Sequence, residues 1–259
     1  MSSTRRLFSL FAFLCAFALV APAAAQEATP TEVVVRAVSN DAKLIQDPVG
    51  GARITIRHAE TGEVLAEGRQ RGDSGSTDKI MRQPHERGAT IYDVPGAAQY
   101  STTLNLTGPT PVEVTATGPL DYPQAMQSTS KTLVLMPGQD VTGDGLTLTL
   151  HGFIVEVLAP SAASAAPGFS LDVRARVRMM CGCPTEPGGL WDSSRYRIQA
   201  QLLREGTVVA EQPLSFTGTT SEYGGTIEVP AEGATTLRVV ASDADRQNFG
   251  TATTSLSSN

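Results

Sequence analysis

The chain has few of the side chains from which catalytic and metal sites are built. Its 259 residues include three histidines, three cysteines and one tryptophan, and aromatic residues make up only 5%. The histidines, at positions 58, 85 and 151, are scattered, and no serine or cysteine nucleophile lies in a recognisable motif. The sequence therefore favours a protein that is not an enzyme. An enzyme with an unrecognised site stays an alternative, because catalytic triads are assembled from residues far apart in the chain.

Long apolar runs are also lacking, with one exception near the start. Residues 7–20 are predominantly apolar, Arg5 and Arg6 precede them, and three alanines, Ala23 to Ala25, follow. This pattern predicts a secretory signal peptide, residues 1–25, cleaved after Ala25. The run is shorter than the roughly 18 residues typical of a membrane span. We therefore expect a periplasmic or secreted protein without a membrane span.

Basic residues are in the minority, 20 against 26 acidic residues, and the signal peptide removes two more arginines. This balance argues against a nucleic-acid partner. Another exported protein or an acidic surface is the expected partner.

Helical periodicity is absent, and apolar and polar residues alternate instead. In residues 52–58, for example, Ile54 and Ile56 share one face while Arg53, Thr55 and Arg57 share the other. Such alternation is typical of half-buried strands, so the predicted fold class is all-β. At Gly152 the apolar face changes parity, which predicts a β-bulge.

The domain organisation follows from one stretch of small residues. Residues 160–168, PSAASAAPG, carry no apolar period and are flanked by proline, so they predict a linker. The expected arrangement is two tandem β-sandwiches of immunoglobulin-like or transthyretin-like type, at residues 26–159 and 169–259, separable at this linker.

The segment RMMCGCPTEPGGLWD, residues 178–192, concentrates sulfur. Met179, Met180, Cys181 and Cys183 lie within five positions, and the single tryptophan, Trp191, follows. A structural corner is favoured, with Trp191 covering the core and a local disulfide between the two cysteines, because an exported compartment is oxidising. Two alternatives remain open. The soft sulfur donors would suit Cu(I), and a disulfide across so short a loop would suit a redox role.

A second candidate site is a face of arginines. Arginines alternate with apolar residues along 171–179, and two more follow at 195 and 197. If these two strands pair, five guanidinium groups share one surface, which is either balanced by nearby carboxylates or binds an acidic partner. The five residues are Arg174, Arg176, Arg178, Arg195 and Arg197.

Two resemblances bear on the fold. The segments MCGCP and PGGLWD, with the later PLSFTG and SEYGGTIEV, resemble a group of uncharacterised bacterial exported proteins with an immunoglobulin-like C-terminal half. The stretch PVGGARITIRHAETGEVLAEG resembles the opening of transthyretin-like and carboxypeptidase-regulatory-like sandwiches. The resemblances imply a fold and a compartment but no activity.

Together these patterns predict an exported, non-catalytic binding or assembly module without a cofactor. A periplasmic protein that handles Cu(I) through residues 179–183 is the first alternative.

Overall fold

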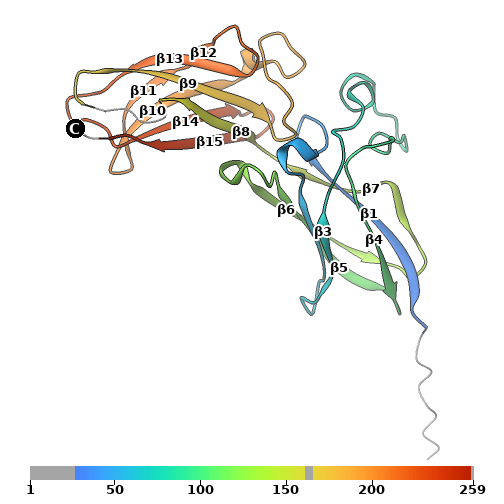
Figure 1. The fold of residues 1–259 in the computed structure, drawn as a ribbon. Helices are drawn as coiled ribbons and strands as arrows, with labels where there is room; N and C mark the ends of the chain where they lie inside the picture. The colour runs from blue at the N-terminus through green and yellow to red at the C-terminus, as the bar shows by residue number, and fades with distance from the viewer. Residues whose placement is uncertain (1–26, 161–165, 258–259) are drawn as a thin grey trace, which may run out of the picture.

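The computed structural model describes residues 27–160 and 166–257, and in these ranges the chain consists of β-strands joined by loops (Figure 1). The predicted all-β fold class is confirmed. No helix of the described residues is long and apolar enough to cross a membrane. The predicted signal peptide, residues 1–25, lies outside the described residues, as do residues 161–165 of the predicted linker. The short helical turns are η1 (Asp47–Val49), η2 (Asp78–Arg82), η3 (Pro123–Ala125) and η4 (Ser193–Arg195).

The first seven strands form an N-terminal sandwich of two sheets. One sheet has the order β4-β1-β7, with β1 parallel to β7 and antiparallel to β4. The other has the order β3-β2-β5-β6 and is antiparallel throughout. The strands are β1 (Thr29–Ser39), β2 (Arg53–His58), β3 (Val64–Arg69), β4 (Tyr100–Leu106), β5 (Thr110–Gly118), β6 (Gln127–Leu135) and β7 (Val141–Leu150).

Alternation along these strands builds the N-terminal core. Ile54 and Ile56 of β2 are fully buried and lie opposite Ala116 and Val114 of β5. The intervening residues of β2, among them Arg53, face away from the core and are exposed or half-buried. The period of two seen in the sequence therefore sets which face of the sheet is buried.

The remaining strands form a C-terminal sandwich with sheets β12-β13-β9-β8 and β11-β10-β14-β15. Taken in chain order as A, B, C, C′, D, E, F and G, these eight strands give an ABED sheet and a C′CFG sheet, which is the immunoglobulin arrangement. The N-terminal sandwich has a different strand order. The C-terminal strands are β8 (Phe153–Ala159), β9 (Ser170–Met179), β10 (Arg197–Arg204), β11 (Thr207–Pro213), β12 (Ser215–Phe216), β13 (Glu222–Glu228), β14 (Thr236–Asp243) and β15 (Asn248–Ser255).

The chain crosses between the sandwiches earlier than the predicted linker. Strand β8 pairs antiparallel with β9, from Phe153 opposite Met179 to Ala159 opposite Arg174, so it belongs to the C-terminal sandwich. Residues 160–168 therefore join two strands of the same sheet, and the crossing lies between Leu150 and Phe153. The predicted boundary is wrong, because a proline-flanked run of small residues suits a strand connection as well as a linker.

A long connection, residues 70–99, joins β3 to β4 and is held by buried polar groups. Gln70 at its start donates to the carbonyls of Ala37 and Ile45. The guanidinium of Arg36, 1% exposed, binds Asp93 at 2.9 Å. Burial lowers the pKa of Arg36, and the carboxylates of Asp93 and Asp144 oppose this shift. Asp144 accepts three backbone hydrogen bonds, from residues 91, 92 and 93.

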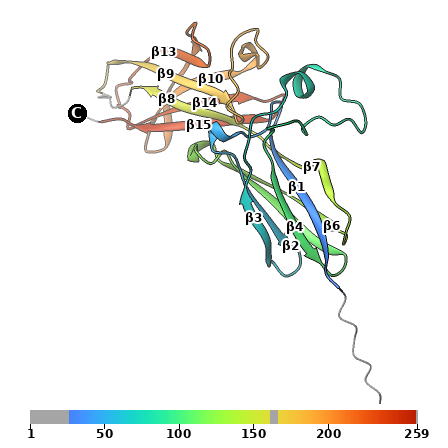
Figure 2. The ribbon, with the colours of Figure 1, turned by 45° about the vertical axis from the view of Figure 1, so that its right-hand side comes forward.

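Figures 1 and 2 show the two sandwiches meeting at an angle. In both views β15 lies along the underside of the C-terminal sandwich. The molecule is therefore an elbow with an inner and an outer side.

Candidate binding surface at the domain junction

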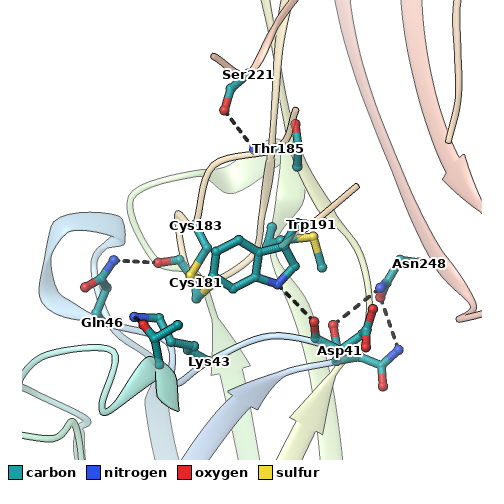
Figure 3. The surroundings of a disulfide bond; sticks show 12 residues. Asp41, Lys43, Gln46, Cys181, Cys183, Thr185, Trp191, Ser221 and Asn248 are labelled. Carbon is teal, nitrogen blue, oxygen red and sulfur yellow. Dashed lines mark hydrogen bonds between the residues drawn. A yellow bond between two sulfur atoms is a disulfide. The ribbon is translucent and has the colours of Figure 1, made fainter. Parts of the chain in front are cut away.

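The sulfur-rich segment lies where the two sandwiches meet. Cys181 and Cys183 are joined by a disulfide, as predicted, and both are buried. The side-chain amide of Gln46 donates to the carbonyl of Cys181 at 2.8 Å (Figure 3). Between the cysteines, Gly182 has a φ of +81°, and a Cβ there would lie 2.7 Å from Val49. Only glycine fits this turn against the N-terminal sandwich.

The sulfur atoms of the segment do not converge on one point. Met179 packs in the C-terminal core, whereas Met180 packs in the N-terminal core. The hydroxyl of Tyr196 donates to Met179 Sδ at 3.8 Å, and burial raises the pKa of that hydroxyl to about 12. With its cysteines bonded to each other and its methionines in separate cores, the segment does not present the set of donors proposed for Cu(I). Within the described residues, no group of three or more histidine, cysteine or acidic side chains is placed to hold a metal ion.

Trp191, which follows the Cys181–Cys183 turn in the chain, also contacts the N-terminal half at this junction. Its ring is buried in the C-terminal core, as predicted, and its indole Nε1 donates to the carbonyl of Asp41 at 3.0 Å (Figure 3). Asp41 also forms an ion pair with Arg246 at 2.6 Å. The neighbouring Ala42, from the N-terminal half of the chain, packs inside the C-terminal core. The predicted structural corner is therefore also the contact between domains.

Gly152 marks the crossing between the sandwiches and is not a bulge within a strand. Its φ is +146°, and a Cβ would lie 3.0 Å from the carbonyl oxygen of Phe249 and 3.2 Å from Met180 Sδ. Its backbone N–H donates to the side chain of Asn248, which also donates to the carbonyl of Asn40. The parity change in the sequence therefore arises because the chain leaves one sheet and enters another.

The five arginines do not share one surface. Strand β9 pairs with β8 and β13, whereas β10 pairs with β11 and β14 in the opposite sheet, so the β9–β10 pairing on which a shared face depended does not form. Arg174 and Arg176 both bind one carboxylate, Glu222, at 2.7 and 2.9 Å. Arg197 binds Glu211 at 3.2 Å. Arg195 lies in η4, outside the strands.

Arg178 links the two domains. It binds Glu156 at 2.8 Å, donates to the hydroxyl of Tyr122 at 2.7 Å and lies over the Tyr122 ring, 5.1 Å from its centroid. Tyr122 belongs to the N-terminal sandwich, so this arginine stabilises the junction by a charge-assisted hydrogen bond and a cation–π contact. Four of the five arginines, all except Arg195, are therefore paired with carboxylates of this chain.

A groove of about 350 Å³ opens at the corner of the elbow. Residues of β14 and β15 form one wall, and the η3 turn with the start of β6 forms the other. Phe249 is 54% exposed at the groove, and Met126, adjacent in sequence to two lining residues, is 43% exposed. The lining residues carry no charge. They are Gln124, Ala125, Gln127, Phe153, Val240, Phe249, Gly250 and Thr251.

Several residues of the groove and the junction could not be predicted from local sequence patterns. Phe249 and Met126 are single apolar residues in polar surroundings, which the alternation rule treats as ordinary surface scatter. Asn40 and Asn248 are 208 positions apart and meet only because the domains do. One local signal was available, the arginine at position 36 inside the apolar run of residues 33–38. A charge in a strand buried on both faces indicates a specific partner.

Comparison with known proteins gives no family. No protein-family model matches the chain, and no curated protein does. Among solved structures, the chain is similar to tandem immunoglobulin-like and fibronectin-like chains. A structure of Dpr2 Ig1-Ig2 in complex with DIP-Theta Ig1-Ig3 aligns over 88% of this chain and 100% of the other, at 8% identity and a TM-score of 0.29. The fibronectin(III)-like modules of Clostridium thermocellum CbhA align over 89% and 94%, at 9% identity and 0.27. TM-scores this low establish no common arrangement, so the fold assignment rests on strand order.

Proposed function

We propose that the mature chain is an exported, non-catalytic binding or assembly module that holds another exported protein in the angle of its elbow. The observation that carries the proposal is the corner groove, where Phe249 is more than half exposed beside a junction of buried contacts. Aromatic side chains, phenylalanine included, are enriched at the centres of protein interfaces. Strands on both sides hold the groove walls in place, so little ordering would oppose binding.

The chemistry of the groove indicates the kind of contact. Its uncharged lining suits an apolar side chain of the partner, placed against Phe249 and Val240. The amides of Gln124 and Gln127 border this apolar area, although Gln124 already donates to the carbonyl of Val155. Interfaces with an apolar centre and a polar rim have this composition. The predicted binding to an acidic surface is not favoured here, because Arg174 and Arg176 are occupied by Glu222.

Site-specific photocrosslinking tests the proposal. A photoreactive phenylalanine analogue is placed at Phe249, and in a matched variant at Phe169, which is 63% exposed on the connection between β8 and β9. In cells of the native host, we expect one predominant adduct with an exported protein from position 249 and none from position 169. Equal adducts from both positions, or no adduct from position 249, would contradict the proposal. An adduct that contains only this chain would show that the bound partner is a second copy of the same protein and not another exported protein.

A further inference from the structure

A second cavity, far from the corner groove in sequence, lies on the long connection between β3 and β4. It is an open basin of about 700 Å³, within the range of small-molecule sites. Three segments frame it: residue 47, residues 71 and 72, and residues 93–97 with residue 99. Connections as long as residues 70–99 with so little secondary structure are uncommon in compact domains, and ordered ones are often functional.

Backbone hydrogen bonds fix the three segments to one another. Asp47 N–H donates to the carbonyl of Gly72 at 3.0 Å. Arg71 and Gln99 exchange both of their backbone hydrogen bonds, at 3.1 and 3.0 Å. The N–H of Asp73 donates to the carbonyl of Gly96 at 2.7 Å. The shape of the basin is therefore formed before any ligand binds.

A buried guanidinium positions two of the side chains in the wall. Arg36 lies behind the basin and donates from one nitrogen to the carboxylate of Asp93 and the amide oxygen of Gln99, at 2.9 and 2.8 Å. From the other it donates to the carbonyls of Ala97 and Ala98. Both terminal nitrogens of the buried guanidinium are thus hydrogen-bonded, whereas its Nε has no partner, and the bonds from the terminal nitrogens hold Asp93, Gln99 and the backbone of residues 97 and 98 in place.

The charges of the basin are balanced inside the protein. Asp93 is paired with Arg36, and Asp47 is paired with Arg71 at 3.6 Å. Each carboxylate keeps acceptor capacity toward the cavity, because Asp93 and Asp47 are 50% and 46% exposed. Arg71, 62% exposed, adds donors. Val94 and Pro95 supply an apolar patch of wall.

We infer that this basin binds a neutral oligosaccharide. Adjacent acceptors and donors match the hydroxyl groups of a sugar, each of which donates and accepts. The apolar wall suits the C–H face of a pyranose ring. A charged ligand gains little from the site, because its carboxylates and guanidinium groups already neutralise each other.

Calorimetric titration of the mature full chain tests the inference. The probes are three neutral trisaccharides (maltotriose, cellotriose and triacetylchitotriose), the cationic trimer of glucosamine and the anionic trimer of galacturonic acid. We expect at least one neutral trisaccharide to bind more tightly than both charged ones. No binding by any neutral trisaccharide, or tighter binding by a charged one, would overturn the inference.

Two matched arginine variants locate the binding. Arg71→Gln should lower the affinity for the neutral trisaccharide about tenfold, which is the effect expected for the loss of one hydrogen bond to a charged group. Arg82→Gln serves as the control, since Arg82 lies on the same connection, is 63% exposed and is paired with Asp78. It should change the affinity less than about twofold, because Arg82 does not line the basin. Equal losses in both variants would exclude the basin as the site.

Discussion

Gln70 has no exposed surface. Its side-chain amide makes hydrogen bonds to the backbone of Ala37 and Ile45, as a neighbouring strand would. Its amide oxygen accepts from the N–H of Ala37, and its amide nitrogen donates to the carbonyls of Ala37 and Ile45. In the sequence this glutamine stands in a polar stretch and reads as surface. Its role could not be predicted, because the groups it satisfies lie 25 and 33 positions away.

Gln70→Ala should lower the free energy of unfolding by about 3 kcal/mol, since the buried Ala37 N–H and Ile45 carbonyl lose their partner and the Ala37 carbonyl loses one of its two donors. Urea denaturation followed by circular dichroism measures this change. Gln139→Ala, at an exposed glutamine in the turn before β7, is the control and should change stability by less than about 0.5 kcal/mol. Similar values for the two variants would show that Gln70 does not hold the connection in place.

Glu222 is the carboxylate that pairs with both Arg176 and Arg174 on β9. The hydrogen bonds from these two arginines, with that from Arg176 the stronger influence, lower the pKa of Glu222 below its ordinary value of 4.5. A carboxylate whose pKa is lower in the folded protein than in the unfolded chain stabilises the fold at pH values above the unfolded pKa. That contribution disappears as the pH falls through the folded pKa.

Glu222→Gln should therefore lower the urea midpoint at pH 7, and the difference from the native chain should shrink as the pH falls below about 4.5. Midpoints measured at several pH values from 7 to 3 test this. Glu228→Gln, at the exposed end of the same strand, is the matched control. A difference that stays constant across this range would mean that the two arginines do not depend on the charge of Glu222.

At the scale of elements, alternation located the strands well. The expected strand at residues 52–58 corresponds to β2, and the alternating residues 171–179 correspond to β9, with the alternate residues buried as predicted. Pairing was harder to predict. The assumed β9–β10 pair is replaced by β8–β9 and β10–β14, because period-two patterns show which face is buried but not which strand lies alongside.

The position of β8 can be tested by dividing the chain. A C-terminal fragment of residues 152–257 should melt cooperatively, whereas residues 168–257 should not, because the latter lacks β8 with the buried Phe153 and Val155. Calorimetry or thermal circular dichroism distinguishes the two outcomes. Cooperative melting of the shorter fragment would restore the boundary at residues 160–168.

In the whole molecule, each hydrophobic core contains side chains from the other half of the chain. Ala42 from the N-terminal half packs in the C-terminal core, while Met180 and Ile154 from the C-terminal sandwich pack in the N-terminal core. Domains joined by small polar contacts move relative to each other by default, and interlocked apolar side chains remove that freedom. The local sequence predicted a tight corner at residues 178–192, but not its function as the joint, because the partner segment lies about 135 positions earlier.

We expect the two sandwiches to form one rigid elbow, and the distance between two spin labels, one in a loop of each sandwich, measures that rigidity. Glu60→Cys in the turn between β2 and β3 and Thr207→Cys at the start of β11 provide exposed labelling sites. In the mature chain Cys181 and Cys183 are bonded to each other and do not compete for the label, and the third cysteine, Cys15, belongs to the predicted signal peptide. Pulsed electron resonance should give one narrow distance population. A broad distribution, or two separate populations, would contradict a rigid elbow.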